Sequence, residues 1–139
     1  MPATVKASDV NEGEELKPWT YQVQREDLLR YANASGDQNP IHQDEAFAKS
    51  VGLPDVIAHG MQTMAKIGQY VTDWAGDPGA VVRFKTRFTK PVVVPAAGGS
   101  SVTISGRVIA KSGTTVTLQL TASTMDGSCG EAEADVELS

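Results

Sequence analysis

The stretch HGMQTMAKIGQYVTDWA, residues 59–75, decides the fold of this chain. Large apolar side chains recur along it at helical spacing. These side chains are Met61, Met64, Ile67, Tyr70, Val71 and Trp74. Alanine and glycine fill much of the remainder, and only Lys66 and Asp73 carry a charge. A helix that is apolar or small on nearly every side is buried, so the sequence predicts one long helix inside the core.

The chain that follows this helix is typical of strands. Residues 82–88 alternate apolar and polar side chains with a period of two, and residues 92–94 are expected to continue that strand past Pro91. Short glycine turns separate three further expected strands, at residues 102–110, 115–125 and 131–138. One helix among antiparallel strands predicts an α+β fold in which a strongly curved sheet wraps the helix.

The chain that precedes the helix is mixed. It is expected to hold a polar irregular segment at 1–18, a strand at 19–23, a helix at 25–34 that ends at Gly36, and a short helical turn within 42–51. A single sheet around a single helix leaves a sheet edge open. We therefore expect a dimer in which sheets join and cavities form between the subunits.

Length and composition narrow the class of protein. The 139 residues suit one compact domain spanning residues 1–139, and 40% apolar with 21% charged residues is a globular composition. The net charge of −5 repels phosphate backbones, so nucleic acid is not an expected partner. The single cysteine, Cys129, excludes an internal disulfide and is expected to lie inert in a turn between strands.

Targeting and membrane segments are not expected either. Residues 1–6 lack the apolar core of a signal peptide. Polar and small residues break every longer uncharged stretch, so none supplies the roughly 20 apolar residues that span a bilayer. The sequence predicts a soluble cytoplasmic protein.

The stretch Ser35-Gly36-Asp37-Gln38-Asn39-Pro40-Ile41-His42 carries the chemistry. A proline turn between Asp37 and His42 can aim a carboxylate and an imidazole into one pocket, where they would move protons around one water. Asn39 is expected to orient Asp37 or a substrate oxygen. In the alternative interpretation the acidic and amide side chains only form a turn, and His42 only caps the helix that follows.

A second stretch, Ile57-Ala58-His59-Gly60-Met61, begins the long helix. Free N–H groups at a helix N-terminus stabilise a negatively charged oxygen, and Gly60 lets a substrate approach the backbone closely. Alternatively, Gly60 only allows the helix to pack against the sheet. His59 is expected to be structural.

Together these two stretches resemble the signature of the MaoC-like dehydratases, also called R-specific enoyl-thioester hydratases or hydratase 2 enzymes. The motifs at 70–81 and 87–89 are in addition similar to the B-type subunits of actinobacterial (3R)-hydroxyacyl-ACP dehydratases. The resemblance implies the hot-dog fold, a long helix wrapped by an antiparallel sheet. It also implies an acid/base pair of Asp37 and His42, support from Asn39, and a backbone N–H donor at Gly60.

The implied activity is addition or removal of water across the 2,3-bond of an acyl thioester, with syn geometry, in fatty-acid metabolism. Its substrate would be an acyl-CoA or acyl-ACP thioester, and its partner a second copy or a related hot-dog subunit. Water is the only co-reactant, so no cofactor is expected. No metal-ligand spacing is visible, so no metal site is expected. A hot-dog thioesterase and a non-catalytic acyl-binding subunit are the alternatives.

A basic stripe stands out in this acidic chain. Arg83, Lys85 and Arg87 recur every second residue, so one face of the predicted strand carries all three. They would meet the phosphates of a pantetheine arm or an acidic carrier protein. The alternative is a solvated outer face of the sheet.

Overall fold

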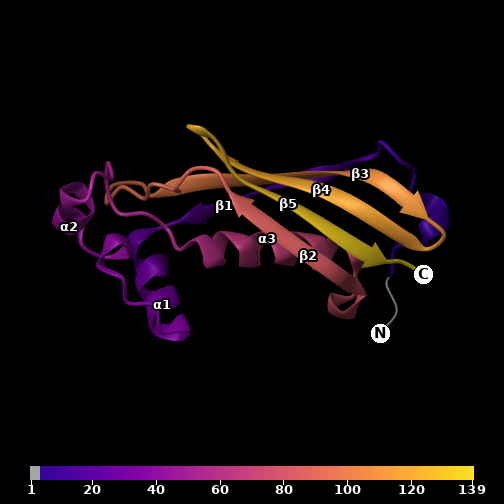
Figure 1. The fold of residues 1–139 in the computed structure, drawn as a ribbon, viewed down its shortest axis with the longest axis horizontal. Helices are drawn as coiled ribbons and strands as arrows, with labels where there is room; N and C mark the ends of the chain where they lie inside the picture. The colour runs from indigo at the N-terminus through magenta and orange to yellow at the C-terminus, as the bar shows by residue number, and fades with distance from the viewer. Residues whose placement is uncertain (1–3) are drawn as a thin grey trace.

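A computed structural model describes residues 4–139 as a five-stranded antiparallel sheet with a long helix, α3, against one face (Figure 1). The strands are β1 (Glu15–Val23), β2 (Val81–Phe88), β3 (Ser100–Ser112), β4 (Thr115–Thr124) and β5 (Gly127–Glu137). The α-helices are α1 (Arg25–Ser35), α2 (Glu45–Ser50) and α3 (Gly60–Ala75). Short 3-10 helices span Ala7–Asp9, Pro40–His42 and Pro78–Ala80.

The sheet has the strand order β1-β3-β4-β5-β2, so β1 and β2 form its edges. Glycine turns join β3 to β4 and β4 to β5 as antiparallel hairpins, as the sequence predicted. Helix α3 lies between β1 and β2 in sequence and crosses the sheet's inner face (Figure 1). Helices α1 and α2 gather at one end of the molecule, where they frame the first turn of α3.

The core lies between α3 and the inner face of the sheet. Ile67 and Val71 of α3 are fully buried against alternate residues of the central strands, which alternate between core and solvent as a half-covered sheet must. The fully buried sheet residues include Val102, Ile104, Leu118, Leu120 and Ala134. The opposite face of the sheet carries polar side chains.

The prediction that α3 is buried on nearly every side is only partly right for a single chain. Met61 is 59% exposed, and Ala65, Gln69 and Asp73 lie on the same uncovered side. The sheet is one layer, so it covers one side of the helix and leaves the other side, with Met61 and Ala65 near its start and the polar Gln69 and Asp73 further along, exposed. Val82 and Phe88 of the edge strand β2 are also exposed.

Three local predictions were wrong. Residues 92–94 do not continue β2: the chain turns away after Thr89, and Val94 N–H donates to Val56 O (2.9 Å) while Ala58 N–H donates to Val92 O (2.9 Å). Pro91 and Pro95 lack the N–H groups that a strand ladder needs. Cys129 lies within β5 rather than in a turn, and its side chain is buried. In addition, β1 begins at Glu15, inside the segment expected to be irregular.

The burial of Ile67 yields a stability prediction. Ile67→Ala should lower the free energy of unfolding by about 2–5 kcal/mol, because it removes buried methyl groups and leaves a cavity under the sheet. Urea unfolding followed by circular dichroism measures the loss. Gln69→Ala, on the exposed side of the same helix, should change stability by no more than about 0.5 kcal/mol. Equal losses in the two variants would contradict this packing.

Among residues 4–139, none of the helices is both long enough and apolar enough to cross a bilayer. The prediction about a signal peptide concerns residues 1–6, and residues 1–3 of that stretch lie outside the described residues.

Candidate active site

The end of α1 positions Asp37. The helix ends at Gly36, whose positive φ of 82° forms a left-handed cap that a glycine adopts without strain. The cap turns the chain sharply, and Asp37 Oδ1 then accepts a hydrogen bond from Asn39 N–H (3.1 Å). The Asp37 side chain is exposed, so water can reach its carboxylate.

Asn39 sets the next turn, the 3-10 helix Pro40–His42. Its Oδ1 accepts a hydrogen bond from Ile41 N–H (3.2 Å), which caps the turn. Asn39 therefore contacts Asp37 through its backbone N–H and uses its side chain to hold the turn that carries His42. These hydrogen bonds are the ones expected if the acidic and amide side chains only form a turn. The same turn also brings Asp37 and His42 close together.

His42 is buried, and its Nδ1 lies 2.6 Å from Ile57 O. A carbonyl oxygen only accepts, so Nδ1 carries the proton and the neutral ring holds its free lone pair on Nε2. A carboxylate oxygen of Asp37 and one ring nitrogen of each of His42 and His59 lie within 4.8 Å of one another. Two hydrogen bonds of about 2.8 Å that meet at one water span about 4.6 Å, so Asp37 and His42 are close enough for one water to contact both.

His59 is more closely tied to this site than the sequence suggested. Its ring stacks on His42 with centroids 3.7 Å apart, and the ring of Tyr31 packs against the His59 ring at a tilt, with centroids 4.7 Å apart. Its Nε2 lies 3.1 Å from Asp37 O, so it donates to the backbone of one member of the pair while stacking on the other. Sequence spacing carried no signal for this contact, because the two histidines are 17 residues apart on different elements.

The surroundings of His42 lower its pKa. Burial disfavours the imidazolium form most strongly, and the neighbouring His59 lowers the pKa further. The hydrogen bond to Ile57 O and the Asp37 carboxylate act in the opposite direction and raise the pKa of His42. The net effect keeps His42 neutral near pH 7, in the form that accepts a proton.

The cluster of Asp37, His42 and His59 also has the composition of a metal site. The geometry of the rings argues against that role. The two imidazole planes are only 23° apart and stacked, so their in-plane lone pairs run side by side rather than converge on one ion. The arrangement suits proton transfer better than metal binding.

Helix α3 begins at Gly60, beside this cluster. The N–H groups of Gln62 and Thr63 both donate to His59 O, which leaves the N–H groups of Gly60 and Met61 without an acceptor among residues 4–139. A Cβ on residue 60 would lie 3.1 Å from the Phe88 ring, so only glycine fits there without displacing that ring. The helix N-terminus therefore presents free donors where a substrate oxygen can approach.

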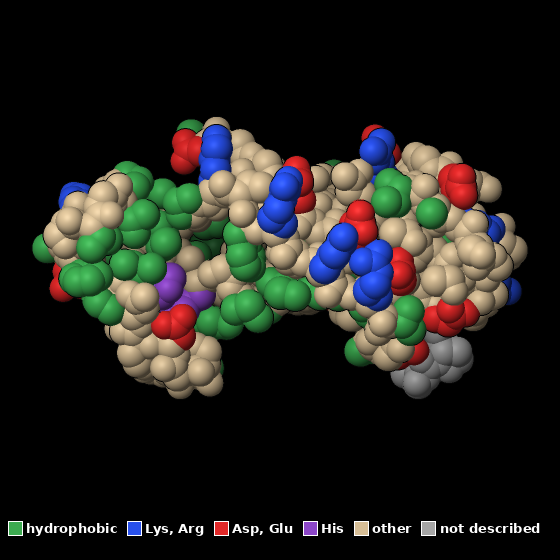
Figure 2. Space-filling view, in the orientation of Figure 1, with side chains coloured by type: hydrophobic (Ala, Val, Ile, Leu, Met, Phe, Trp, Pro, Cys, Tyr) green, Lys and Arg blue, Asp and Glu red, His purple; other side chains and the backbone are tan. Residues whose placement is uncertain are grey.

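A hollow of about 330 Å³ lies between His42 and the start of α3 at Gly60, and Asp37 and His59 are not among the residues that line it. Its wall includes His42, Gly60, Thr63, Phe88 and Cys129, and it is mainly apolar, with polar groups from His42, two threonines and Lys90. In Figure 2 parts of the two buried histidine side chains are visible next to an acidic side chain, with apolar side chains around them. Sequence reasoning missed Thr63, Phe88 and Cys129, because three separate elements bring them to the wall.

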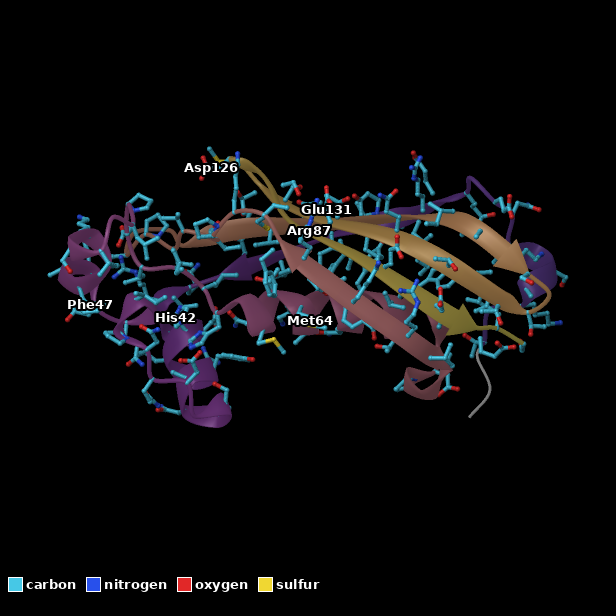
Figure 3. All side chains as sticks on the ribbon, in the orientation of Figure 1. His42, Phe47, Met64, Arg87, Asp126 and Glu131 are labelled. Atoms are coloured by element: carbon cyan, nitrogen blue, oxygen red, sulfur yellow. The ribbon has the colours of Figure 1, made fainter. Side chains whose placement is uncertain are left out.

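The basic stripe of Arg83, Lys85 and Arg87 lies away from the hollow. Arg83 Nε bonds Asp135 (2.7 Å), Arg87 Nη2 bonds Glu131 (2.8 Å), and Lys85 lies 3.6 Å from Glu133. Phe84 and Phe88 of the same strand face α3, so the three cations point to the outer face of the sheet. Figure 3 shows Arg87 beside Glu131 on the sheet, away from His42. This pairing with β5 fits the alternative interpretation, a solvated outer face.

The arrangement matches a known family. A family model described as a MaoC like domain matches residues 8–125. The chain belongs to the MaoC-like family. Its fold is therefore the hot-dog fold, which confirms the predicted architecture, and the family recognised from the motifs at 35–42 and 57–61 is confirmed with it.

The chain is similar to individual MaoC-like proteins over different lengths. The chain is 49% identical over 72 residues to 3-hydroxyacyl-thioester dehydratase X of Mycobacterium tuberculosis, which covers 52% of this chain and 25% of that protein. A solved structure of a MaoC-like dehydratase superposes with a TM-score of 0.97 at 39% identity, over 99% of this chain and 43% of that one. R-hydratase PhaJ1 from Pseudomonas aeruginosa superposes with a TM-score of 0.84 at 25% identity, over 99% and 87%. The chain thus spans a quarter of the first relative and less than half of the second.

Proposed function

We propose that this MaoC-like chain adds water to, or removes it from, the 2,3-bond of an acyl thioester, as a (3R)-hydroxyacyl-thioester dehydratase or R-specific hydratase. The observation that carries the proposal is the closeness of Asp37 to His42, whose ring lines a mainly apolar hollow together with Gly60 and Thr63 of the first turn of α3. The names of the dehydratase from M. tuberculosis and the R-hydratase from P. aeruginosa support the same reaction class.

In hydration, a water held between Asp37 and His42 gives up one proton to the pair as its oxygen bonds to C3 of the 2-enoyl thioester. The π electrons move toward the thioester carbonyl, whose oxygen becomes enolate-like. The Gly60 N–H, aided by the helix dipole, stabilises that oxygen. The pair then returns a proton to C2, which completes the addition on one face. Dehydration runs through the same steps in reverse.

We further propose that the substrate is carried by coenzyme A or an acyl-carrier protein, and that a second hot-dog subunit, identical or related, packs on the uncovered side of α3. The exposed apolar groups Met61, Val82 and Phe88 support such a partner, because large apolar side chains on adjacent elements form a surface suited to association. A cytoplasmic location stays a prediction from the sequence.

The direct test uses the purified chain with crotonyl-CoA and longer 2-enoyl-CoA thioesters. We expect loss of the enoyl absorbance without release of free thiol, and a (3R)-hydroxyacyl product on chiral analysis. Thiol release at the rate of substrate loss would instead identify a thioesterase. A chain that binds the thioester but neither hydrates nor hydrolyses it, alone or with a related subunit, would identify a non-catalytic acyl-binding subunit.

The lowered pKa of His42 yields a prediction for pH dependence. A histidine whose folded-state pKa lies below its ordinary value of 6.5 stays neutral until the pH falls below that value. The acidic limb of kcat/KM, which reports the free enzyme, should therefore have its midpoint below pH 6.5. Stability should also fall as the pH drops through this range, because the unfolded chain takes up the proton first. An acidic limb centred above pH 6.5 would contradict this environment for His42.

A further inference from the structure

Arg25, the first residue of α1, joins three segments that are far apart in sequence. Its Nε donates to Val94 O (2.6 Å), and its Nη2 donates to Asp55 Oδ1 (2.7 Å) and lies 3.6 Å from Glu45 of α2. The side chain is only 26% exposed, so these bonds lie partly out of solvent. A guanidinium is planar and forked, which lets one side chain hold a carbonyl and a carboxylate in fixed directions.

The segments that Arg25 holds lead directly to His42. Asp55 Oδ1 also accepts from Val56 N–H (2.8 Å), and Val56 O accepts from Val94 N–H (2.9 Å). The next residue, Ile57, donates its N–H to Ile41 O (3.1 Å) and accepts from His42 Nδ1 (2.6 Å). Thus the carbonyl that fixes the ring of His42 belongs to a short segment, 55–58, that is held on one side by Arg25 and residues 92–94.

We propose that Arg25 is a positioning residue for His42: it fixes segment 55–58 so that Ile57 O holds the imidazole in its proton-accepting orientation. This inference rests on the proposed role of His42 in the reaction. Arg25 touches neither member of the acid/base pair, so its effect on chemistry passes entirely through Asp55, Val94 and the backbone between them.

Arg30, the other arginine of α1, forms its ion pairs within its own helix. Arg30 lies one and a half turns further along the same helix, pairs with Glu26 and Asp27 of its own helix, and has a side chain that is 71% exposed. Arg30→Ala therefore removes a cation from α1 without touching segment 55–58 and serves as the matched control. Arg25→Lys keeps the charge and loses the fork, so it should behave as an intermediate between wild type and Arg25→Ala.

The test is an NMR titration of the histidine rings. The chain has two histidines, so the signals that disappear in a His42→Gln variant identify His42. The titratable groups that face His42 are Asp37 and His59, and both are unchanged in the Arg25 variants. In Arg25→Ala the bond to Ile57 O loosens, so the midpoint of His42 should move to lower pH than in wild type and Arg30→Ala. Turnover should fall by about one to two orders of magnitude with KM within about twofold, since small misplacements of a catalytic group have effects of this size.

Identical His42 titrations in wild type, Arg30→Ala and Arg25→Ala would overturn the proposal. If Arg25→Ala does not fold, Arg25→Lys and Asp55→Asn test the same link, and both must shift the midpoint of the His42 titration to lower pH. The ring titration does not depend on turnover. An inactive wild-type chain would therefore count against the proposed function, while the titration still decides whether Arg25 positions His42.

Discussion

Asp37→Asn should lower kcat/KM for a 2-enoyl thioester by about 10²–10⁴-fold while the fold survives. The range is that of general acid–base catalysis, which an amide cannot provide. The amide Oδ1 can still accept the hydrogen bond from Asn39 N–H, so the turn that carries His42 should keep its shape. Enoyl absorbance measures the rate, and thermal unfolding confirms that the melting temperature stays within a few degrees.

Asp44→Asn is the matched control for this variant. It makes the same chemical change seven residues further along, where the side chain only caps α2 by accepting from Phe47 N–H (3.0 Å), and asparagine caps helices as well as aspartate does. Its turnover should equal that of wild type. His42→Gln should lose as much activity as Asp37→Asn, and the double variant should lose little more, because residues that act as a unit are not additive. Wild-type turnover in Asp37→Asn or in His42→Gln would reject the acid/base pair.

Gly60→Ala should lower kcat by about 10²–10³-fold, the size of effect seen when an oxyanion donor is lost. The new methyl group would stand beside the first free N–H of α3 and 3.1 Å from the Phe88 ring, in the path of the substrate carbonyl. The fold should tolerate the change, because alanine favours helix formation over glycine. Single-turnover hydration separates this loss from any change in product release.

Gly68→Ala tests whether any added methyl on α3 has the same effect. A Cβ there would meet the Phe84 ring at 3.5 Å, an ordinary contact, and Gly68 lies outside the hollow, so activity should be unchanged. The double variant Gly60→Ala/Phe88→Ala removes the crowding and keeps the methyl group in front of the N–H. Recovery of turnover to the level of Phe88→Ala would show that the displaced ring, not the blocked donor, caused the loss.

The predicted elements and the observed ones agree where local pattern and tertiary packing favour the same structure. The bounds of α1 follow from a capping box of Gln24 and Asp27 at its start and Gly36 at its end, all of which act within one turn. The prediction that residues 92–94 continue β2 was wrong because these three valines have the composition of a strand but pair with residues 56–58, a partner that only the folded chain supplies. The prediction that Cys129 lies in a turn was wrong for a related reason: the turn ends at Gly127, where pairing with β4 starts the strand.

The sequence by itself determined the α+β architecture of a sheet around one long helix, the turn that joins Asp37 to His42, and the glycine at the start of α3, because each depends on periodicity or on residues within one or two turns of one another. Only the tertiary structure decided the stacking of His59 on His42, the side of the sheet to which the basic stripe points, and the link from Arg25 through Asp55 to Ile57. Those contacts join residues that are distant along the chain, and their distances and directions are set by how the sheet, α1 and α3 pack. No local pattern of side chains encodes that packing, since many chains with the same hydrophobic period place their polar residues differently.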